Sequence, residues 1–128
     1  MVLCMIEQAK IYQLDEKLLM AVAQTESSYN RNAVSIADCK GLMQTSDILA
    51  EEAGYKSEDL FQPEISIQIG AEYMNRQMEN FDDDTILALT AYNQGPGSIY
   101  EGDYDLFYAE QTMQHLKTLE NFLQDSEF

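Results

Sequence analysis

Apolar residues recur at intervals of three and four along most of this chain, and this spacing is the strongest constraint on its fold. Such periodicity is typical of amphipathic α-helices, because residues at these intervals share one helix face. The chain has only two prolines and few stretches in which apolar and polar residues alternate as in a half-buried strand. We therefore expect a mostly α-helical fold.

Capping and breaking residues divide the pattern into separate helices. The expected helices are residues 4–13; a second after Asp15; a third after Thr45 or Ser46, ending near Gly54; a fourth opened by Pro63; a fifth after Asp84, Thr85 to Gln94; and a last one after Gly95, Pro96 and Gly97. The fifth is apolar nearly all round, so we place it at the centre of the core. The last helix should close over it with one apolar side: Leu106, Ala109, Met113, Leu116 and Leu123.

The size and charge of the chain limit its domain count and its partners. With 128 residues and no internal repeat or linker, residues 1–128 are expected to form one domain. Seven basic against 23 acidic residues give a net charge of −16, which excludes a nucleic-acid binder held by phosphate contacts. The hydrophobic fraction of 45% is that of a folded globular chain.

Neither a membrane span nor a secretion signal is visible. The longest apolar runs fall far below the ~20 residues that cross a bilayer. Glu7 follows Ile6 directly, which leaves no room for the apolar stretch of a signal peptide. Cys4 and Cys39 have no metal or redox spacing, and we expect thiols rather than a disulfide.

Glu26 occupies an unusual place in the second expected helix. It lies four residues after Val22 and seven after Leu19, so a helical register carries its carboxyl group onto the apolar stripe. Burial and the negative end of the helix dipole both raise the pKa of a carboxyl group. Such a group can stay protonated near neutral pH and act as a general acid. A helix that ends one turn earlier would instead leave Glu26 in solvent.

Four short motifs, in order, carry a resemblance to a known family. They are Glu26-Ser27, Asn32-Ala33-Val34-Ser35, Gly41-Leu42-Met43-Gln44 and Ala91-Tyr92-Asn93-Gln94-Gly95-Pro96-Gly97. Together they resemble the soluble lytic transglycosylase domain of the goose-type lysozyme superfamily, from about Ile6 to about Leu123. The resemblance implies a single lysozyme-like catalytic domain, one that a larger cell-wall protein can carry, with helices around a central buried helix and a glycan cleft.

The resemblance also implies a bacterial or phage-derived enzyme that cleaves the β-1,4 bond between N-acetylmuramic acid and N-acetylglucosamine in peptidoglycan. The matched Glu26 would protonate the glycosidic oxygen and then accept the proton of the 6-hydroxyl as an anhydro ring closes. One carboxyl group then suffices, whereas a hydrolase ordinarily uses a second one. Peptidoglycan strands are the implied partner, and the expected location is outside the cytoplasm, secreted or associated with the cell wall.

Seven further residues match positions of the family that contact substrate: Ser27, Ser35, Met43, Gln44, Tyr92, Asn93 and Tyr108. Ser35 would bind sugar or order its loop, and Met43 would give an apolar wall. Tyr92 would hold the carboxyl group of Glu26 through its hydroxyl, and Asn93 would bind an acetamido or hydroxyl group. Tyr108 would also reach the same carboxyl group.

Departures from the family pattern keep other functions open. Asp38, Cys39 and Lys40 stand where small residues are usual, and Asp38 and Asp47 lie near the loop in which water-using goose-type members carry extra acids. A muramidase that uses water is therefore an alternative. The net charge of −16 opposes binding to an anionic cell wall, so a catalytically idle binding module is another.

The sequence gives no reason to expect a metal or another cofactor. The acidic run of Asp82, Asp83 and Asp84 lacks the alternating ligands and the glycine of a calcium loop. His115 has no second histidine or cysteine pair at metal spacing, and we expect it at the surface. We also expect a monomer.

Overall fold

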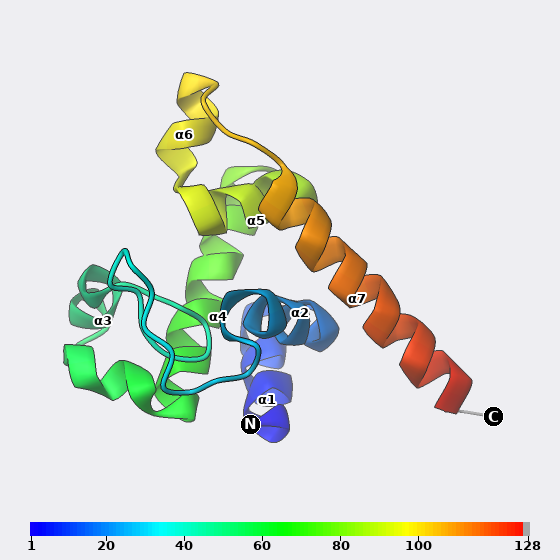
Figure 1. Ribbon diagram of the computed structural model, residues 1–128, viewed down its shortest axis with the longest axis horizontal. Coiled ribbons are helices and arrows are strands. Elements are labelled where there is room, and N and C mark those ends of the chain that lie inside the picture. Colours follow the sequence, from blue (N-terminus) through cyan, green and yellow to red (C-terminus); the bar gives the residue numbers. More distant parts are fainter. Residues whose placement is uncertain (127–128) are drawn as a thin grey trace.

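The computed structural model describes residues 1–126, which form helices around one main core with no β-strand among them (Figure 1). The helices are α1 (Val2–Tyr12), α2 (Glu16–Ser27), α3 (Asp47–Glu52), the short 3₁₀ helix η1 (Ser57–Phe61), α4 (Pro63–Asn80), α5 (Thr85–Gln94), α6 (Pro96–Glu101) and α7 (Phe107–Ser126). The mostly α-helical fold expected from the sequence is confirmed.

The expected helix caps are present. The side chains of Asp15, Ser46 and Asp84 each accept a backbone N–H from the first turn of α2, α3 and α5, at 2.9, 3.3 and 3.1 Å. Ser46 rather than Thr45 caps α3, and Pro63 is the first residue of α4. Each cap binds an N–H group that the helix itself leaves without a partner, which fixes where the helix begins.

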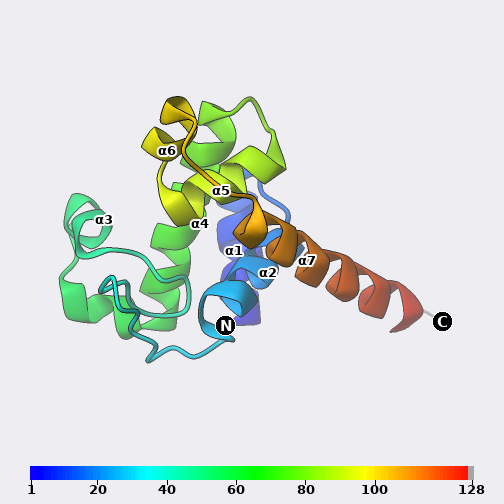
Figure 2. The same ribbon diagram turned by 45° about the horizontal axis from the view of Figure 1, so that its top comes forward.

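Helix α5 lies at the centre, as expected, with Ala88 to Tyr92 all buried. Helix α7 packs against α5 but more extensively against α2, and its C-terminal part projects away from the body (Figures 1 and 2). The predicted apolar side of α7 is therefore correct only in its middle. Leu106 precedes the helix and is 38% exposed, and Leu123 is 40% exposed.

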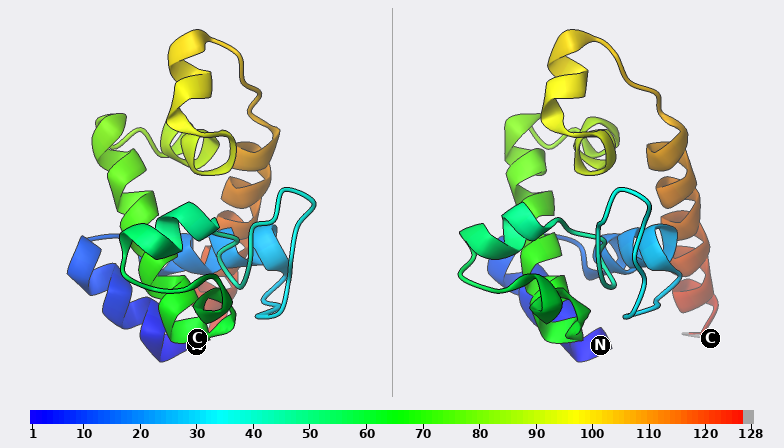
Figure 3. Two further views of the ribbon diagram at one scale, coloured as in Figure 1. Left: turned by 90° about the vertical axis from the view of Figure 1, so that its left-hand side faces the viewer. Right: turned by 60° about the vertical axis from the view of Figure 1, so that its left-hand side comes forward.

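Two short helices were not expected from the sequence. The Gly95–Pro96–Gly97 segment ends α5, but Pro96 also begins α6, because its fixed φ suits the first position of a helix. The 3₁₀ helix η1 lies between α3 and α4. Helix α6 and its connection to α7 rise above α5 at the opposite end of the molecule from α1 (Figure 3).

The connection between α2 and α3 folds back on itself without forming a strand (Figure 3). The Ser35 N–H donates to the Cys39 carbonyl at 3.0 Å, and the Gly41 N–H donates to the Ala33 carbonyl at 2.9 Å. Gly41 has φ +83°, and a Cβ there would collide with the Leu60 carbonyl oxygen. Only glycine therefore allows this turn to pack so closely against η1.

Within residues 1–126, no helix combines the length and the apolar character that crossing a membrane requires. Cys4 and Cys39 are both free thiols, as expected.

Candidate active site

The Glu26 side chain lies in the last turn of α2, which ends at Ser27, and it is only partly exposed. Burial raises the pKa of Glu26 from 4.5 to about 7, and a hydrogen bond from Tyr108 opposes part of this rise. Loss of hydration disfavours the ionised form of a carboxyl group. Glu26 therefore faces inward as the sequence periodicity predicts, and a substantial fraction of it is protonated at neutral pH.

Tyr108, in the first turn of α7, holds the Glu26 carboxyl group. Its phenol O–H donates to Glu26 Oε2 at 2.9 Å, and the tyrosine is only 7% exposed. This bond joins two helix ends that lie far apart in the sequence, and it fixes the rotamer of the carboxyl group. The contact expected between Tyr108 and Glu26 is present.

Tyr92 has a different partner from the one we expected. Its phenol O–H donates to the Met43 carbonyl at 2.7 Å rather than to Glu26. A phenol has one hydrogen to donate, so this bond uses it. Tyr92 thus ties α5 to the turn at residues 41–44, while its ring remains in the wall of the cleft.

A cavity of about 440 Å³ opens over Glu26. Its walls are formed by the α2–α3 connection and by the end of α5: Glu26, Ser35, Ile36, Ala37, Cys39, Gln44, Tyr92 and Asn93. A second cavity of about 560 Å³ shares Cys39, Gln44, Tyr92 and Asn93 with it and continues toward α3 and α4. Because the two cavities share these four residues, we treat them as one cleft that runs from Glu26 toward α3 and α4.

Two residues expected to contact substrate are used inside the fold instead. Met43 is fully buried in the core and packs against Gly70 of α4, so it is not a wall of the cleft. The Ser27 hydroxyl donates to the carbonyls of Leu42, at 2.8 Å, and Ala23, at 3.1 Å. Ser27 therefore joins the end of α2 to the turn at residues 41–44.

Gln44, Asn93 and Ser35 lie in the wall of the cleft as expected. The Gln44 amide nitrogen donates to the Ala33 and Gly41 carbonyls at 3.0 and 2.9 Å, which leaves its amide oxygen for a ligand. Asn93 is exposed, and its side chain makes no hydrogen bond within the described residues. The Ser35 hydroxyl accepts the Cys39 N–H at 3.1 Å, so Ser35 orders its loop and can still donate to a ligand.

The acidic residues of the nearby loop pair with Lys40. The Lys40 ammonium lies 2.9 Å from Asp47 and 3.2 Å from Asp38, and neither aspartate lines the Glu26 cavity. Hydrogen bonds from Lys40 and Ser57 lower the pKa of Asp47. Lys40 thus connects the loop to the start of α3, and Glu26 is the only carboxyl group among the residues that line its cavity.

The sequence did not reveal the polar residues behind Glu26. His115 is partly buried rather than at the surface, and its Nδ1 lies 3.0 Å from Thr25 Oγ1. The fully buried Thr112 hydroxyl donates to the same Thr25 oxygen at 3.0 Å. The described residues contain no group of three or more His, Cys, Asp or Glu side chains placed to hold a metal ion.

Comparison with known proteins identifies the family of the chain. The model of the transglycosylase SLT domain family matches residues 3–103. Membrane-bound lytic murein transglycosylase C of Shigella sonnei is 36% identical, over 74% of this chain and 31% of its own length. The chain thus spans about a third of this relative.

Two solved structures share the fold. The 70 kDa soluble lytic transglycosylase of Escherichia coli is 25% identical with a TM-score of 0.67, over 89% of this chain and 21% of that chain. An inactive mutant of the lytic transglycosylase Slt of Pseudomonas aeruginosa is 24% identical with a TM-score of 0.69, over 88% of this chain and 20% of that chain. The lysozyme-like fold expected from the motifs is confirmed, and the chain belongs to the transglycosylase SLT domain family.

Proposed function

We propose that this chain is the catalytic domain of a peptidoglycan lytic transglycosylase. The observation that carries the proposal is the Glu26 carboxyl group, whose pKa is raised to about 7 by burial in the wall of a cleft. The family and the name of the Shigella sonnei relative support a murein glycan as the substrate. The proposed reaction cleaves the β-1,4 bond after N-acetylmuramic acid and leaves a 1,6-anhydro end.

Glu26 serves as acid and then as base in this reaction. The neutral carboxyl group donates its proton to the glycosidic oxygen as the bond to the muramyl C1 breaks. The acetamido group of the substrate stabilises the positive charge that develops at C1. The resulting carboxylate then removes the proton of the muramyl 6-hydroxyl, and the 6-oxygen closes on C1. Glu26 ends protonated, so no net proton is consumed.

The absence of a second carboxyl group from the wall of the Glu26 cavity favours this route over hydrolysis. Glycosidases that use water ordinarily place two carboxyl groups at a defined separation. The loop residues Asp38 and Asp47 are engaged by Lys40. Glu52, in the wall of the second cavity, pairs with Arg76. Because Glu26 lacks a partner to activate water, the substrate 6-hydroxyl is the better nucleophile for this cleft.

Substrate contacts are assigned to the polar groups that the fold leaves unused. Asn93 offers an amide without an internal partner, Gln44 offers its amide oxygen, and Ser35 offers its hydroxyl hydrogen. These groups match the acetamido and hydroxyl groups of an amino sugar. The ring of Tyr92 adds an apolar surface between them.

We further propose that the domain acts as a monomer outside the cytoplasm, as one part of a larger cell-wall protein. The relative is named as membrane-bound and is about three times as long as the matched segment. The net charge of −16 repels anionic wall polymers, so long-range targeting is left to other parts of such a protein.

The products released from purified sacculi distinguish the proposed function from two alternatives. A lytic transglycosylase releases fragments with anhydro-muramyl ends, each lighter by one water than the hydrolytic product, and this is the expected result. Reducing muramyl ends that take up oxygen from isotopically heavy water would assign a muramidase. Binding to sacculi without soluble fragments, across several pH and salt values, would assign an idle binding module.

A further inference from the structure

The segment that connects α5 to α7 is held by polar contacts rather than by the core. From Asn93 to Phe107 no residue is buried, whereas Tyr92 before this segment and Tyr108 after it are only 7% exposed. Helix α6 lies within the segment and rises away from the body (Figure 3). Burial of apolar surface therefore does not fix the path by which the chain reaches Tyr108.

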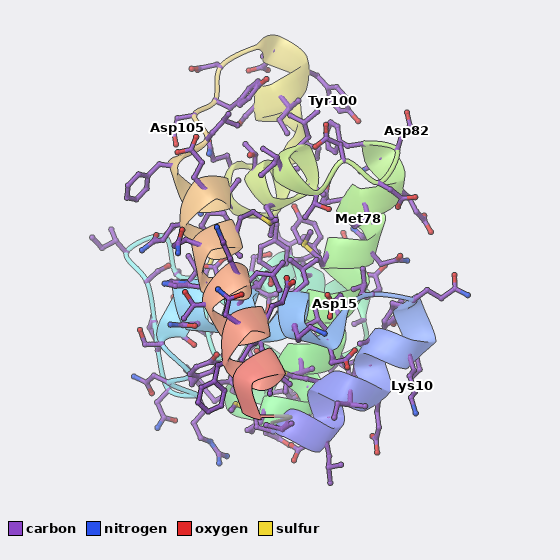
Figure 4. The ribbon with its side chains drawn as sticks, turned by 90° about the vertical axis from the view of Figure 1, so that its right-hand side faces the viewer. Lys10, Asp15, Met78, Asp82, Tyr100 and Asp105 are labelled. Carbon is purple, nitrogen blue, oxygen red and sulfur yellow. The ribbon has the colours of Figure 1, made fainter. Side chains whose placement is uncertain are left out.

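Gln94, the last residue of α5, closes this segment through its side-chain amide. The amide nitrogen donates to the Asp105 carbonyl at 2.8 Å, and the amide oxygen accepts the Asp105 N–H at 3.2 Å. Figure 4 shows Asp105 on the connection that leads from α6 into α7. Because one amide binds both backbone groups of the same residue, the two bonds fix the orientation of Asp105 as well as its position.

The rest of the segment is tied to the same end of α5. The Ser98 hydroxyl donates to the Gln94 carbonyl at 2.7 Å, and the Asp103 N–H donates to the Ser98 carbonyl at 2.9 Å. The Tyr100 ring of α6 stacks on Phe81, with 5.6 Å between the ring centroids. Gln94 thus lies at the base of a loop whose ends are joined across 11 residues, and this closure restricts how far the start of α7 can move.

The closed end of this loop leads directly to the Glu26 carboxyl group. Asp105 Oδ1 accepts the N–H of Phe107, the first residue of α7, at 3.1 Å. Tyr108 is the next residue, and its phenol donates to Glu26 Oε2 at 2.9 Å. Each step from Gln94 to Glu26 is therefore a hydrogen bond or a step to the neighbouring residue in the chain.

We propose that Gln94 is a positioning residue for Glu26, because it anchors the start of α7 and so keeps the Tyr108 phenol within hydrogen-bond reach of the carboxyl group. A hydrogen bond to a carboxylate is short and directional, so it weakens when its donor moves. The inference rests on the proposed function, which makes Glu26 the acid and the base. Two adjacent residues at the end of α5 then have separate roles: Asn93 contacts substrate, and Gln94 acts on Glu26.

A titration of Glu26 measures this role without substrate. In protein labelled with ¹³C at glutamate carboxyl carbons, the Glu26 signal is assigned by its loss in Glu26→Gln. Gln94→Met keeps the length of the side chain and removes both bonds to Asp105. The Tyr108 bond lowers the pKa of Glu26, so a looser bond raises it. Complete loss of a hydrogen bond to charge corresponds to about 1 to 2 pH units, and partial loosening should raise the pKa by about 0.5.

The titration separates positioning from direct binding of sugar. Gln94 also lines the cavity that continues toward α3 and α4, so its loss can change KM. A lost contact with sugar cannot alter a titration that is recorded without sugar. Gln62→Met is the matched control, because it removes a glutamine amide that donates one bond elsewhere, to Asp59 at 3.3 Å. It should leave the pKa of Glu26 at the parent value.

A double-mutant cycle tests whether Gln94 acts through Tyr108. The bond to Glu26 is absent in Tyr108→Phe, so the addition of Gln94→Met to this variant should cause no further rise in the Glu26 pKa. An unchanged titration in folded Gln94→Met overturns the proposal. A rise of the same size in the phenylalanine background, or in the Gln62→Met control, overturns it too, because the shift would then have another origin.

Hydrogen exchange tests the anchor in the unaltered protein. The Asp105 N–H donates to Gln94, whereas the N–H of the neighbouring Tyr104 makes no hydrogen bond within the described residues. Both residues are exposed, so only the bond can protect Asp105. After correction for intrinsic rates, the Asp105 N–H should exchange about tenfold more slowly or less, because exchange awaits opening of the bond. Equal exchange of the two N–H groups would contradict the anchor.

Both measurements are independent of catalysis, so the two proposals can fail separately. If titration and exchange give the expected results in a chain that releases no fragments from sacculi, the proposed function is wrong and the action of Gln94 on Glu26 stands. If the chain releases anhydro-ended fragments but Gln94→Met leaves the Glu26 titration unchanged, the proposed function stands and the role of Gln94 is wrong.

Discussion

The Tyr108 phenol donates a 2.9 Å hydrogen bond to Glu26 Oε2 across 82 residues of sequence, and it joins the start of α7 to the end of α2. The bond favours the ionised form of a carboxyl group that burial otherwise keeps neutral. These two opposing effects set the pH at which Glu26 changes from acid to base. The start of α7 therefore tunes the carboxyl group on which the proposed mechanism depends, in addition to its part in the fold.

Tyr108→Phe should raise the pKa of Glu26 above its value of about 7. A hydrogen bond to a charged group contributes about 1.5–3 kcal/mol, which corresponds to a rise of about 1 to 2 pH units. Wild-type lysis of sacculi should decline as the pH increases through about 7, because the acid loses its proton. The Tyr108→Phe variant should lyse sacculi more slowly, and its decline in rate should occur at a higher pH. Turbidity assays across a pH series measure both effects.

Tyr104→Phe is the matched control, because Tyr104 is 39% exposed and its hydroxyl makes no hydrogen bond within the described residues. Its pH profile should equal that of the parent. A Tyr108→Phe profile that declines at the same pH as the parent would show that the phenol does not tune Glu26.

Glu26→Gln should stabilise the folded protein at alkaline pH but not at acidic pH. The folded pKa of about 7 lies above the ordinary value of 4.5, so the unfolded chain ionises first and wild-type stability declines as the pH rises between these values. Above pH 7 the loss is constant at about 3 kcal/mol, and glutamine removes it. Urea unfolding at about pH 4 and pH 8 measures the difference. An equal effect of the substitution at both pH values would mean that Glu26 titrates normally in the fold.

Gly70→Ala should destabilise the fold by about 1–3 kcal/mol, as overpacking of a core does. The added Cβ would lie 2.6 Å from Met43 Cβ and 2.7 Å from Met43 Cγ. Displacement of Met43 also disturbs the carbonyl that accepts the Tyr92 hydroxyl. Gly97→Ala is the control, since nothing lies within 4 Å of its added Cβ. Thermal unfolding compares the two, and equal midpoints would contradict the close contact between α4 and Met43.

Asn93→Ala should raise KM severalfold and change the free energy of unfolding by less than about 0.5 kcal/mol, as for an exposed side chain without internal bonds.

Ser27→Ala should show the opposite pattern, with a lower free energy of unfolding and an unchanged KM. Its hydroxyl bonds to Leu42 and Ala23 contribute about 0.5–1.5 kcal/mol of stability, and it does not line the cleft. Kinetics on defined glycan fragments together with urea unfolding separate the two roles. An unchanged KM in Asn93→Ala would remove that residue from the binding surface.

Features set by neighbouring residues in the chain could be predicted from the sequence. Asp15 and Asp84 cap helices because their carboxylates reach N–H groups within three residues. The inward direction of Glu26 follows from helical periodicity along one short segment. These predictions need no knowledge of how the helices pack.

Features set by distant segments could be predicted only where the family resemblance supplied them, as it did for the contact between Tyr108 and Glu26. The Tyr92 hydroxyl donates to the carbonyl of Met43, 49 residues away in the sequence. The contact of His115 with Thr25 depends on how α7 lies against α2. Met43 was expected in the cleft wall because its motif is next to the site, but its side chain turns into the core where Gly70 leaves space. The spacing of residues along the chain does not indicate any of these contacts.

The measurement that tests the account most directly compares the release of soluble fragments from sacculi by the wild-type chain and by Glu26→Gln, with the fold of both confirmed by circular dichroism. The account predicts anhydro-ended fragments from the wild type and a loss of about a hundredfold or more in the variant, because Glu26 supplies both proton transfers. A folded variant that retains more than about a tenth of the wild-type rate would contradict the central role of this carboxyl group.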